Sequence, residues 1–329
     1  MLKKEKYNAL IIGSNFGYNS HFKALKKINF FNIHITSPNI KNKNIKDKKI
    51  RKFSSYKYAL KKNKYHIITF AVPPKVQEEI IKYIISKKIS VKYLFFEKFY
   101  SADIKFINKS FNYFIKENIL INLNFIFPKL THWKILTKFL KNKKIKFVKY
   151  RWFFKQSFFN NLQKTWKIDK NKGGGLYFYY LIHLIYNLVT LFKKIEILDL
   201  TKSSSNKHKL IDYSFIKLLC GKKIPCEIEI SNNSMNNIHH LLIKTKNNTI
   251  ELINNSKNWT NKFLIKKNMK IKYKFNNKSY NERFMLTLKN IKELLNYNSP
   301  KDKNYLIKLS NIITSHKIIN NISMKNERS

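Results

Sequence analysis

Short apolar runs alternate with amphipathic stretches through the first hundred residues. Four runs have the length and composition of buried strands, over 9–12, 32–36, 66–72 and 91–96. Helical patterns follow the first and third runs, over 20–27 and 76–86. Strands that alternate with helices predict a parallel sheet with helices on both faces.

The pattern changes after about residue 120. A strand over 121–127, a helix over 133–140 and a strand over 147–154 precede a long apolar helix over 176–192. Strand-like segments then follow in series, over 195–200, 213–220, 224–231, 241–252 and 263–275, before helices over 282–296 and 305–319. Strands in series favour an antiparallel sheet. The sequence therefore predicts an α/β protein with two domains, 1–120 and 121–329, the second an α+β domain with a mostly antiparallel sheet.

The composition bears on the class of partner. The chain has 329 residues, 43% of them hydrophobic, and a formal net charge of +49. A charge of this size is typical of nucleic-acid binding, but the lysines are spread over nearly every segment. Lys, Asn, Ile, Phe and Tyr share A/T-rich codons, so drift in base composition explains the excess more simply. We expect no nucleic-acid partner, although such a binder stays an alternative.

Cysteine usage and hydropathy bear on the compartment. Two cysteines, Cys220 and Cys226, provide neither a disulfide framework nor a zinc site, so we expect no metal and a reducing, cytoplasmic setting. The apolar run at the N-terminus is too short for a signal peptide. The run over 176–192 contains His183 and Asn187, and we expect a buried helix there and no membrane contact.

Five of the six glycines stand in two clusters. The first cluster is Gly13 and Gly17, and the second is the triple glycine over 173–175, just before the apolar helix. Gly13 and Gly17 lie between a predicted strand and a predicted helix. Glycine allows a sharp turn there, and the helix amides can then face a pyrophosphate. Asn15 takes the second glycine position of the usual G-x-G-x-x-G pattern. The alternative is an ordinary strand–helix turn.

Three further groups of residues carry candidate chemistry. Pro73 and Pro74 follow one predicted strand, and Glu97 and Lys98 follow the next, at the sheet edge where ligands bind in such folds. The alternatives are a plain loop and a solvated strand end. His183 follows Tyr179 by four residues on the apolar helix and could act as a general base, or simply be a core histidine.

The order and spacing of these groups resemble the glucose–fructose oxidoreductase/inositol dehydrogenase (Gfo/Idh/MocA) family. The matching strings are GSNFGYNSHFKAL, VPPKVQ, EKF and GGGLYFYYLIH. The resemblance implies an N-terminal Rossmann dinucleotide-binding domain and a C-terminal domain with a large open sheet, mostly antiparallel. It also implies NAD(P) as cofactor and a sugar, sugar nucleotide or cyclitol as substrate. Because a large uncovered sheet needs a partner, we expect a homodimer or homotetramer that pairs through the C-terminal sheet.

The resemblance also assigns roles to residues. Gly13, Asn15, Phe16 and Gly17 would line the pyrophosphate, Pro73 and Pro74 would flank the cofactor, and Glu97 and Lys98 would lie near the nicotinamide ribose. Lys98 would orient the substrate hydroxyl, and His183 would act as acid/base. Tyr179 is not part of the family pattern, but it shares a helical face with His183 and could hold the substrate or orient the imidazole.

Cofactor preference is read from the end of the second strand. Ser37 stands there with Lys41 and Lys43 beyond it, and the acidic residue typical of an NAD site is absent, which favours NADP.

Three positions depart from the family pattern. Asn15 replaces a glycine, Phe99 replaces a proline after the lysine, and Tyr179 replaces an aspartate four residues before the histidine. Two interpretations therefore stay open. One is an NAD(P)-dependent dehydrogenase or reductase, and the other is a catalytically impaired family member that binds nucleotides or sugars.

Overall fold

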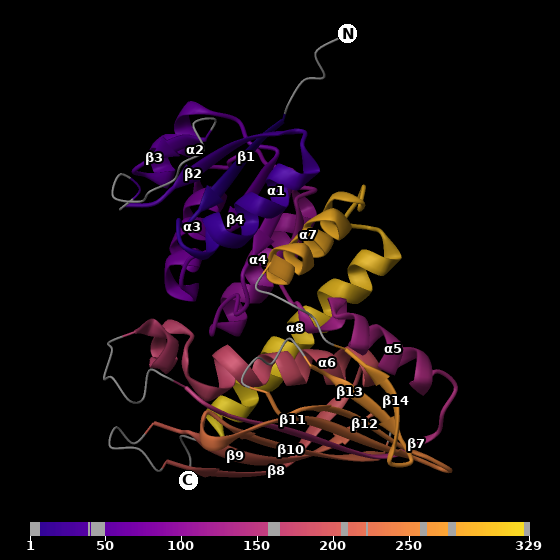
Figure 1. Ribbon diagram of the computed structural model, residues 1–329. Coiled ribbons are helices and arrows are strands. Elements are labelled where there is room, and N and C mark those ends of the chain that lie inside the picture. The colour runs from indigo at the N-terminus through magenta and orange to yellow at the C-terminus, as the bar shows by residue number, and fades with distance from the viewer. Residues whose placement is uncertain are drawn as a thin grey trace. The chain divides into compact units, whose positions relative to one another are not determined.

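The computed structural model describes residues 7–38, 40, 50–156, 165–204, 210–221, 223–256, 262–275 and 281–325 (Figure 1). The chain divides into two compact units. Unit 1 consists of Met1–Ile126 and Tyr280–Ile313, and unit 2 of Phe127–Ser279 and Thr314–Ser329. The domain boundary expected between residues 120 and 121 falls inside a strand of unit 1, and the helix expected over 282–296 groups with unit 1.

Unit 1 is built on one parallel sheet of six strands. They are β1 (Tyr7–Ile12), β2 (Phe31–Thr36), β3 (Arg51–Phe53), β4 (Ile67–Phe70), β5 (Tyr93–Phe96) and β6 (Leu120–Leu123). The order in the sheet is β3-β2-β1-β4-β5-β6, and every pairing is parallel. The predicted α/β class is confirmed. The strand order reverses direction between β1 and β4, which is the point where such sheets bind ligands.

The helices of unit 1 come from both ends of its sequence. They are the π-helical turn η1 (Gly17–Phe22), α1 (Lys23–Ile28), α2 (Tyr56–Lys62), α3 (Pro74–Ser86), α4 (Ile104–Lys116), α7 (Asn281–Leu295) and the first half of α8 (Lys303–Met324). Helix α7 packs against α1, η1, β5 and β6. The segment Tyr280–Ile313, near the end of the chain, therefore completes the unit that the first part begins.

Local sequence sets several of these boundaries. Pro74 is the first residue of α3, where its missing N–H has no helical partner to lose. Asp103 caps α4, and its carboxylate accepts hydrogen bonds from the amides of Lys105 and Phe106. Asn29 ends α1 in the left-handed conformation, with φ of 63°.

Unit 2 contains an eight-stranded sheet. Its strands are β7 (Ile145–Lys155), β8 (Ile195–Ser203), β9 (Tyr213–Cys220), β10 (Ile224–Ser231), β11 (Asn233–Thr245), β12 (Thr249–Asn254), β13 (Leu264–Lys267) and β14 (Lys270–Lys274). The order is β14-β13-β12-β11-β7-β10-β9-β8, and only β7 and β10 pair in parallel. The predicted, mostly antiparallel sheet is confirmed. The segments expected over 241–252 and 263–275 each prove to be two antiparallel strands.

The helical elements of unit 2 precede most of its strands. They are η2 (Phe127–Lys129), α5 (Thr131–Leu140), η4 (Trp166–Ile168), η5 (Lys170–Lys172), the π-helical turn η6 (Leu176–Leu181) and α6 (Ile182–Phe192), and the second half of α8 also belongs to this unit. Residues Ile182–Val189 of α6 are all buried, as expected for a helix that is apolar on every side. No helix in the described part of the chain combines the length and hydropathy that crossing a membrane requires.

Candidate functional site

The first candidate site lies where the strand order of unit 1 reverses. Gly13 directly follows β1, and Ala71 directly follows β4. The amide of Ala71 donates a hydrogen bond to the carbonyl of Ile12 at 2.8 Å. Gly13 has φ of +108°, and a Cβ there would lie 2.3 Å from the Ala71 carbonyl oxygen. Only glycine fits this conformation and this close approach. The fold itself therefore requires Gly13, with or without a ligand.

The chain after Gly13 turns into a helix that starts with π-helical geometry. Gly17 is buried, and a Cβ there would lie 2.8 Å from Cγ2 of Ile11. Asn15 is exposed and Phe16 is half-buried, with its ring edge-on to His21 at 5.7 Å. The two glycines thus allow the start of the helix to lie against the end of β1. This is the turn that the sequence predicts for binding the phosphates of a dinucleotide.

Ser37 lies beside this turn, at the end of the neighbouring strand β2. The hydroxyl of Ser14 donates a hydrogen bond to Oγ of Ser37 at 3.1 Å. The described residues directly after β2 are Ser37, Pro38 and Ile40, none of which is acidic, whereas Lys41 and Lys43 lie outside the described residues.

Pro73 and Pro74 connect β4 to α3. Pro73 caps the helix in an extended conformation, and Pro74 begins it, two residues earlier than the sequence pattern indicates. Pro73 is half-buried and Pro74 is buried. The pair is thus a rigid strand-to-helix connection at the same sheet edge as Gly13.

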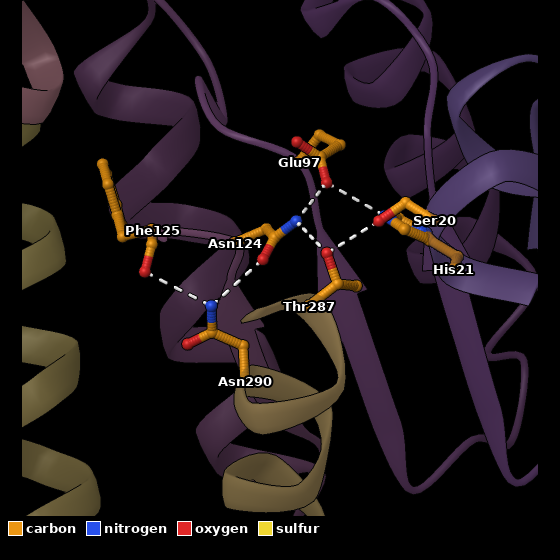
Figure 2. Close-up of polar contacts among 7 residues, drawn as sticks. All are labelled: Ser20, His21, Glu97, Asn124, Phe125, Thr287 and Asn290. Atoms are coloured by element: carbon orange, nitrogen blue, oxygen red, sulfur yellow. Dashed lines mark hydrogen bonds and ion pairs between the residues drawn. The ribbon is translucent and has the colours of Figure 1, made fainter. Parts of the chain in front are cut away.

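Glu97 follows β5 at that edge and is the centre of a polar network (Figure 2). Its Oε1 accepts a hydrogen bond from Nδ2 of Asn124 at 2.7 Å and lies 2.9 Å from Nε2 of His21. The network continues to Ser20, Thr287 and Asn290. Sequence reasoning treated His21 only as part of a motif and missed the other four residues, because Ser, Asn and Thr at scattered positions have no spacing that marks them.

Lys98 is held between two anchored neighbours. It is half-buried, its peptide bond to Phe99 is cis, and Phe99 and Tyr100 are buried. The hydroxyl of Tyr100 donates to Oγ of Ser110 at 2.9 Å, and its carbonyl accepts from Nε2 of Gln77 at 3.0 Å. Burial raises the pKa of the Tyr100 phenol far above its usual range, so the phenol stays neutral. The backbone on both sides of Lys98 is therefore fixed.

The second candidate site lies in unit 2, after the triple glycine. Gly173 and Gly175 have φ of 81° and 80°, and a Cβ on Gly174 would lie 2.1 Å from the carbonyl oxygen of Trp166. The turn leads into η6, which contains Tyr179. The Tyr179 ring is edge-on to Trp166 at 5.5 Å, and Nζ of Lys167 lies 5.8 Å from its centre.

His183 lies in the first turn of α6, directly after the π-helical turn. It is 4% exposed, and its ring is edge-on to Phe127 at 5.0 Å and to Trp152 at 6.2 Å. Both glycine motifs of the chain thus lead into a π-helical turn, with His21 inside the first and His183 just after the second. Such turns occur frequently at functional sites. A 3.6-residue periodicity does not reveal them.

Two more histidines lie in the same aromatic cluster of unit 2. Nε2 of His239 lies 3.1 Å from the hydroxyl of Tyr150, which also accepts from Asn187. His132 stacks on Phe263 with 3.8 Å between ring centres. Burial lowers the pKa of both His132 and His239 to about 3. Both imidazoles are therefore neutral at pH 7, and neither was among the predicted residues.

The structure gathers most of the predicted site residues in two places. Residues of the glycine turn, Ser37, the proline pair, Glu97 and Lys98 occupy the carboxyl edge of one parallel sheet in unit 1. Tyr179 and His183 lie on one continuous helical stretch of unit 2. Among the described residues, no group of three or more His, Cys, Asp or Glu side chains could hold a metal ion.

Comparison of the structure with solved structures identifies the fold. The 3-ketoreductase KijD10 of Actinomadura kijaniata, in complex with NADP and TDP-benzene, has a TM-score of 0.77 at 11% identity over 97% of each chain. The WlbA dehydrogenase of Chromobacterium violaceum, in complex with NADH and UDP-GlcNAcA, has a TM-score of 0.75 at 11% identity, over 99% of this chain and 95% of that one.

A regulator is as similar as these enzymes. The transcriptional regulator Gal80p of Kluyveromyces lactis has a TM-score of 0.78 at 14% identity, over 99% of this chain and 94% of that one. No family model matches the sequence, and no curated protein matches it either. These neighbours have the Gfo/Idh/MocA fold, so the chain has that fold over nearly its whole length.

Proposed function

We propose that the protein is an NAD(P)-dependent oxidoreductase that transfers hydride between a nicotinamide and a secondary alcohol of a sugar, sugar nucleotide or cyclitol. The observation that carries the proposal is the edge of the unit 1 sheet. There the Gly13 turn lies at the reversal point of the strand order, and Glu97 and Lys98 end a strand of the same sheet. The two enzymes with this fold named above bind NADP or NADH together with a nucleotide ligand.

The residues of unit 1 fit a dinucleotide. The turn at Gly13, Asn15, Phe16 and Gly17 brings the start of a helix to the sheet edge, and the Asn15 side chain is exposed there. These residues would hold the pyrophosphate, and Pro73, Pro74 and Glu97 would flank the nicotinamide end. Ser37, with no described acidic neighbour after β2, supports NADP over NAD.

The chain's own residues supply the acid–base chemistry. NAD(P), when bound, accepts or donates the hydride. His183 of unit 2 would take the hydroxyl proton during oxidation and return it during reduction, and the Lys98 ammonium of unit 1 would stabilise negative charge that develops on the substrate. Tyr179 holds the substrate or orients the imidazole. Because His183 is 4% exposed, we expect a dry environment, which strengthens such interactions.

Substitutions of Lys98 and His183 test the proposal. We expect Lys98→Met and His183→Ala each to lower turnover by roughly a hundredfold or more, the effect of losing a group that moves or stabilises a proton, while NAD(P) affinity stays within about twofold in His183→Ala. The control is Lys92→Met, which should keep full activity. Lys92 is exposed and directly precedes β5, the strand that Glu97 and Lys98 follow. Unchanged turnover in both site variants, measured over a panel of sugar nucleotides and cyclitols, would exclude the proposed chemistry.

A second function is favoured by one specific observation. A regulator of transcription has the same fold, and Asn15, Phe99 and Tyr179 depart from the motifs of the enzymes. A nucleotide- or sugar-binding protein without turnover would bind NAD(P) and show no hydride transfer with any substrate. A nucleic-acid binder would instead bind unrelated DNA with an affinity that falls steeply with salt.

The outer face of the unit 2 sheet supports self-association. Partly exposed apolar side chains on this face, Phe153, Phe215 and Leu242, lie among charged ones such as Lys149, which pairs with Glu227 and Glu229. We propose that a second copy covers the face, giving a homodimer or homotetramer. Buried free thiols at Cys220 and Cys226 support a cytoplasmic location.

A further inference from the structure

The carboxylate of Glu97 is bound on one side only. Its Oε1 accepts from Asn124 and from His21, whose Nε2 therefore carries a proton. The His21 side chain is fully buried and that of Glu97 is 17% exposed. Among the described residues, no side chain or amide bonds to Oε2. One oxygen is thus committed to the protein, and the other is left for a ligand.

Asn124 reaches Glu97 in only one orientation. Both hydrogens of its Nδ2 are used, one by Glu97 and one by Oγ1 of Thr287 at 3.0 Å, and its Oδ1 accepts from Nδ2 of Asn290 at 3.0 Å. The reverse orientation would place the amide oxygen against the carboxylate. Every polar atom of this buried amide is therefore satisfied, which fixes its position.

The partners of Asn124 come from α7, near the end of the chain. Thr287 is fully buried and its hydroxyl lies 2.8 Å from Oγ of Ser20, in the first π-helical turn. Asn290 also donates to the carbonyl of Phe125 at 3.2 Å. The network thus ties the glycine-turn helix, the end of β6 and α7 to one carboxylate (Figure 2).

We propose that Asn124 and Thr287 are positioning residues for Glu97, and through its backbone for Lys98. They hold the carboxylate so that Oε2 faces the nicotinamide end of the site, and the affinity of unit 1 for NAD(P) depends on them. The part of the inference that concerns cofactor affinity rests on the proposed function. The part that concerns the position of the carboxylate stands on the contacts alone.

Asn122 provides a matched control. It lies in β6, two residues before Asn124, which directly follows that strand. Asn122 is fully buried, and its Nδ2 donates to the carbonyl of Asn290 in α7 at 3.0 Å. It makes no bond to Glu97. Replacing Asn122 and Asn124 by leucine therefore removes the same kind of side chain from the same interface, but only Asn124→Leu releases the carboxylate.

The first measurement needs no cofactor. In protein labelled with ¹⁵N-histidine, the Nε2 proton of His21 should give a slowly exchanging signal, assigned by its loss in His21→Gln. We expect this signal to disappear or shift in Asn124→Leu and in Thr287→Val, and to persist in Asn122→Leu and Thr287→Ser. Thr287→Val keeps the shape of the side chain, so it tests the hydroxyl even if Asn124→Leu does not fold.

The second measurement is calorimetric titration with NADPH and NADH. We expect affinity to fall about tenfold or more in Asn124→Leu and Thr287→Val, the effect of losing a hydrogen bond to a charged group, with Thr287→Ser and Asn122→Leu within about twofold. Equal losses in Asn122→Leu, or an unchanged His21 signal in Asn124→Leu and Thr287→Val, would overturn the positioning role. A wild-type protein that binds neither nucleotide would refute the proposed function, while the His21 signal still decides the role of Asn124.

Discussion

The buried imidazole of His132 should make unit 2 sensitive to acid, and His132→Phe should relieve that sensitivity. His132 is 1% exposed on α5 and stacks on Phe263. Its Nδ1 is buried without a hydrogen-bond partner among the described residues. Phenylalanine has a similar shape and no titrating group, so it can keep the stacking and remove only the charge that acid would add.

The size of the effect follows from the pKa. Burial lowers the pKa of His132 from 6.5 to about 3 in the folded state, so the unfolded chain takes up the proton first as the pH falls. Stability is full above pH 6.5 and is lost between pH 6.5 and 3, by about 1.4 kcal/mol per pH unit. At pH 4.5, two units below the unfolded pKa, the loss due to His132 is about 3 kcal/mol.

Tryptophan fluorescence can follow unit 2 by itself. All four tryptophans, Trp133, Trp152, Trp166 and Trp259, belong to unit 2. Urea unfolding at pH 7.5 and 4.5 should show a free-energy difference about 3 kcal/mol smaller in His132→Phe than in the wild type. Phe263→Leu, which removes the stacking partner and no charge, should lower stability equally at both pH values. An identical pH dependence in His132→Phe and wild type would refute the reasoning.

Two further predictions concern unit 1. Gly13→Ala should lower the stability of β1, measured by hydrogen exchange of its amides, by about 2 kcal/mol or more, because the new Cβ meets the Ala71 carbonyl in a left-handed backbone. Gly17→Ala, in helical backbone, should cost about 1 kcal/mol, and equal losses would contradict this account. Asp103→Ala should destabilise α4 by about 1 kcal/mol through loss of its cap, whereas Asp103→Asn should not; faster amide exchange in both would point to the charge instead of the cap.

The fold was predictable because its main features are local. Short apolar runs, two of them ending at Gly13 and Pro73, indicated β1, β2, β4 and β5 within two residues at each end. Gly13 is required by the very turn that it marks. The prediction missed β3 and α2, and it missed α4 between β5 and β6. It also merged the two C-terminal hairpins. A short polar turn between two alternating segments breaks the pattern too little to be recognised.

The candidate site was only half visible in the sequence, for a different reason. Glu97, Lys98 and His183 stand in motifs whose spacing can be recognised. The residues that hold Glu97 belong to no such motif. Asn124 and Thr287 are 163 positions apart and meet only after α7 folds back onto the sheet. Burial of His132 and His239 likewise depends on partners from distant strands. Sequence patterns identify groups that lie close along the chain, and the structure supplies the groups that hold them.

The polar network bears on the choice between enzyme and binding protein. A buried carboxylate contributes less to stability than an apolar side chain of similar volume would, and Nδ1 of His21 has no hydrogen-bond partner among the described residues. Stability alone therefore does not explain why Glu97 is held by Asn124 and His21 with one oxygen left over. A ligand that uses that oxygen explains it, for an enzyme and for a binding protein alike. Our proposal assigns the difference between the two functions to Lys98 and His183, because only hydride transfer needs a group that stabilises negative charge on the substrate and a group that moves a proton.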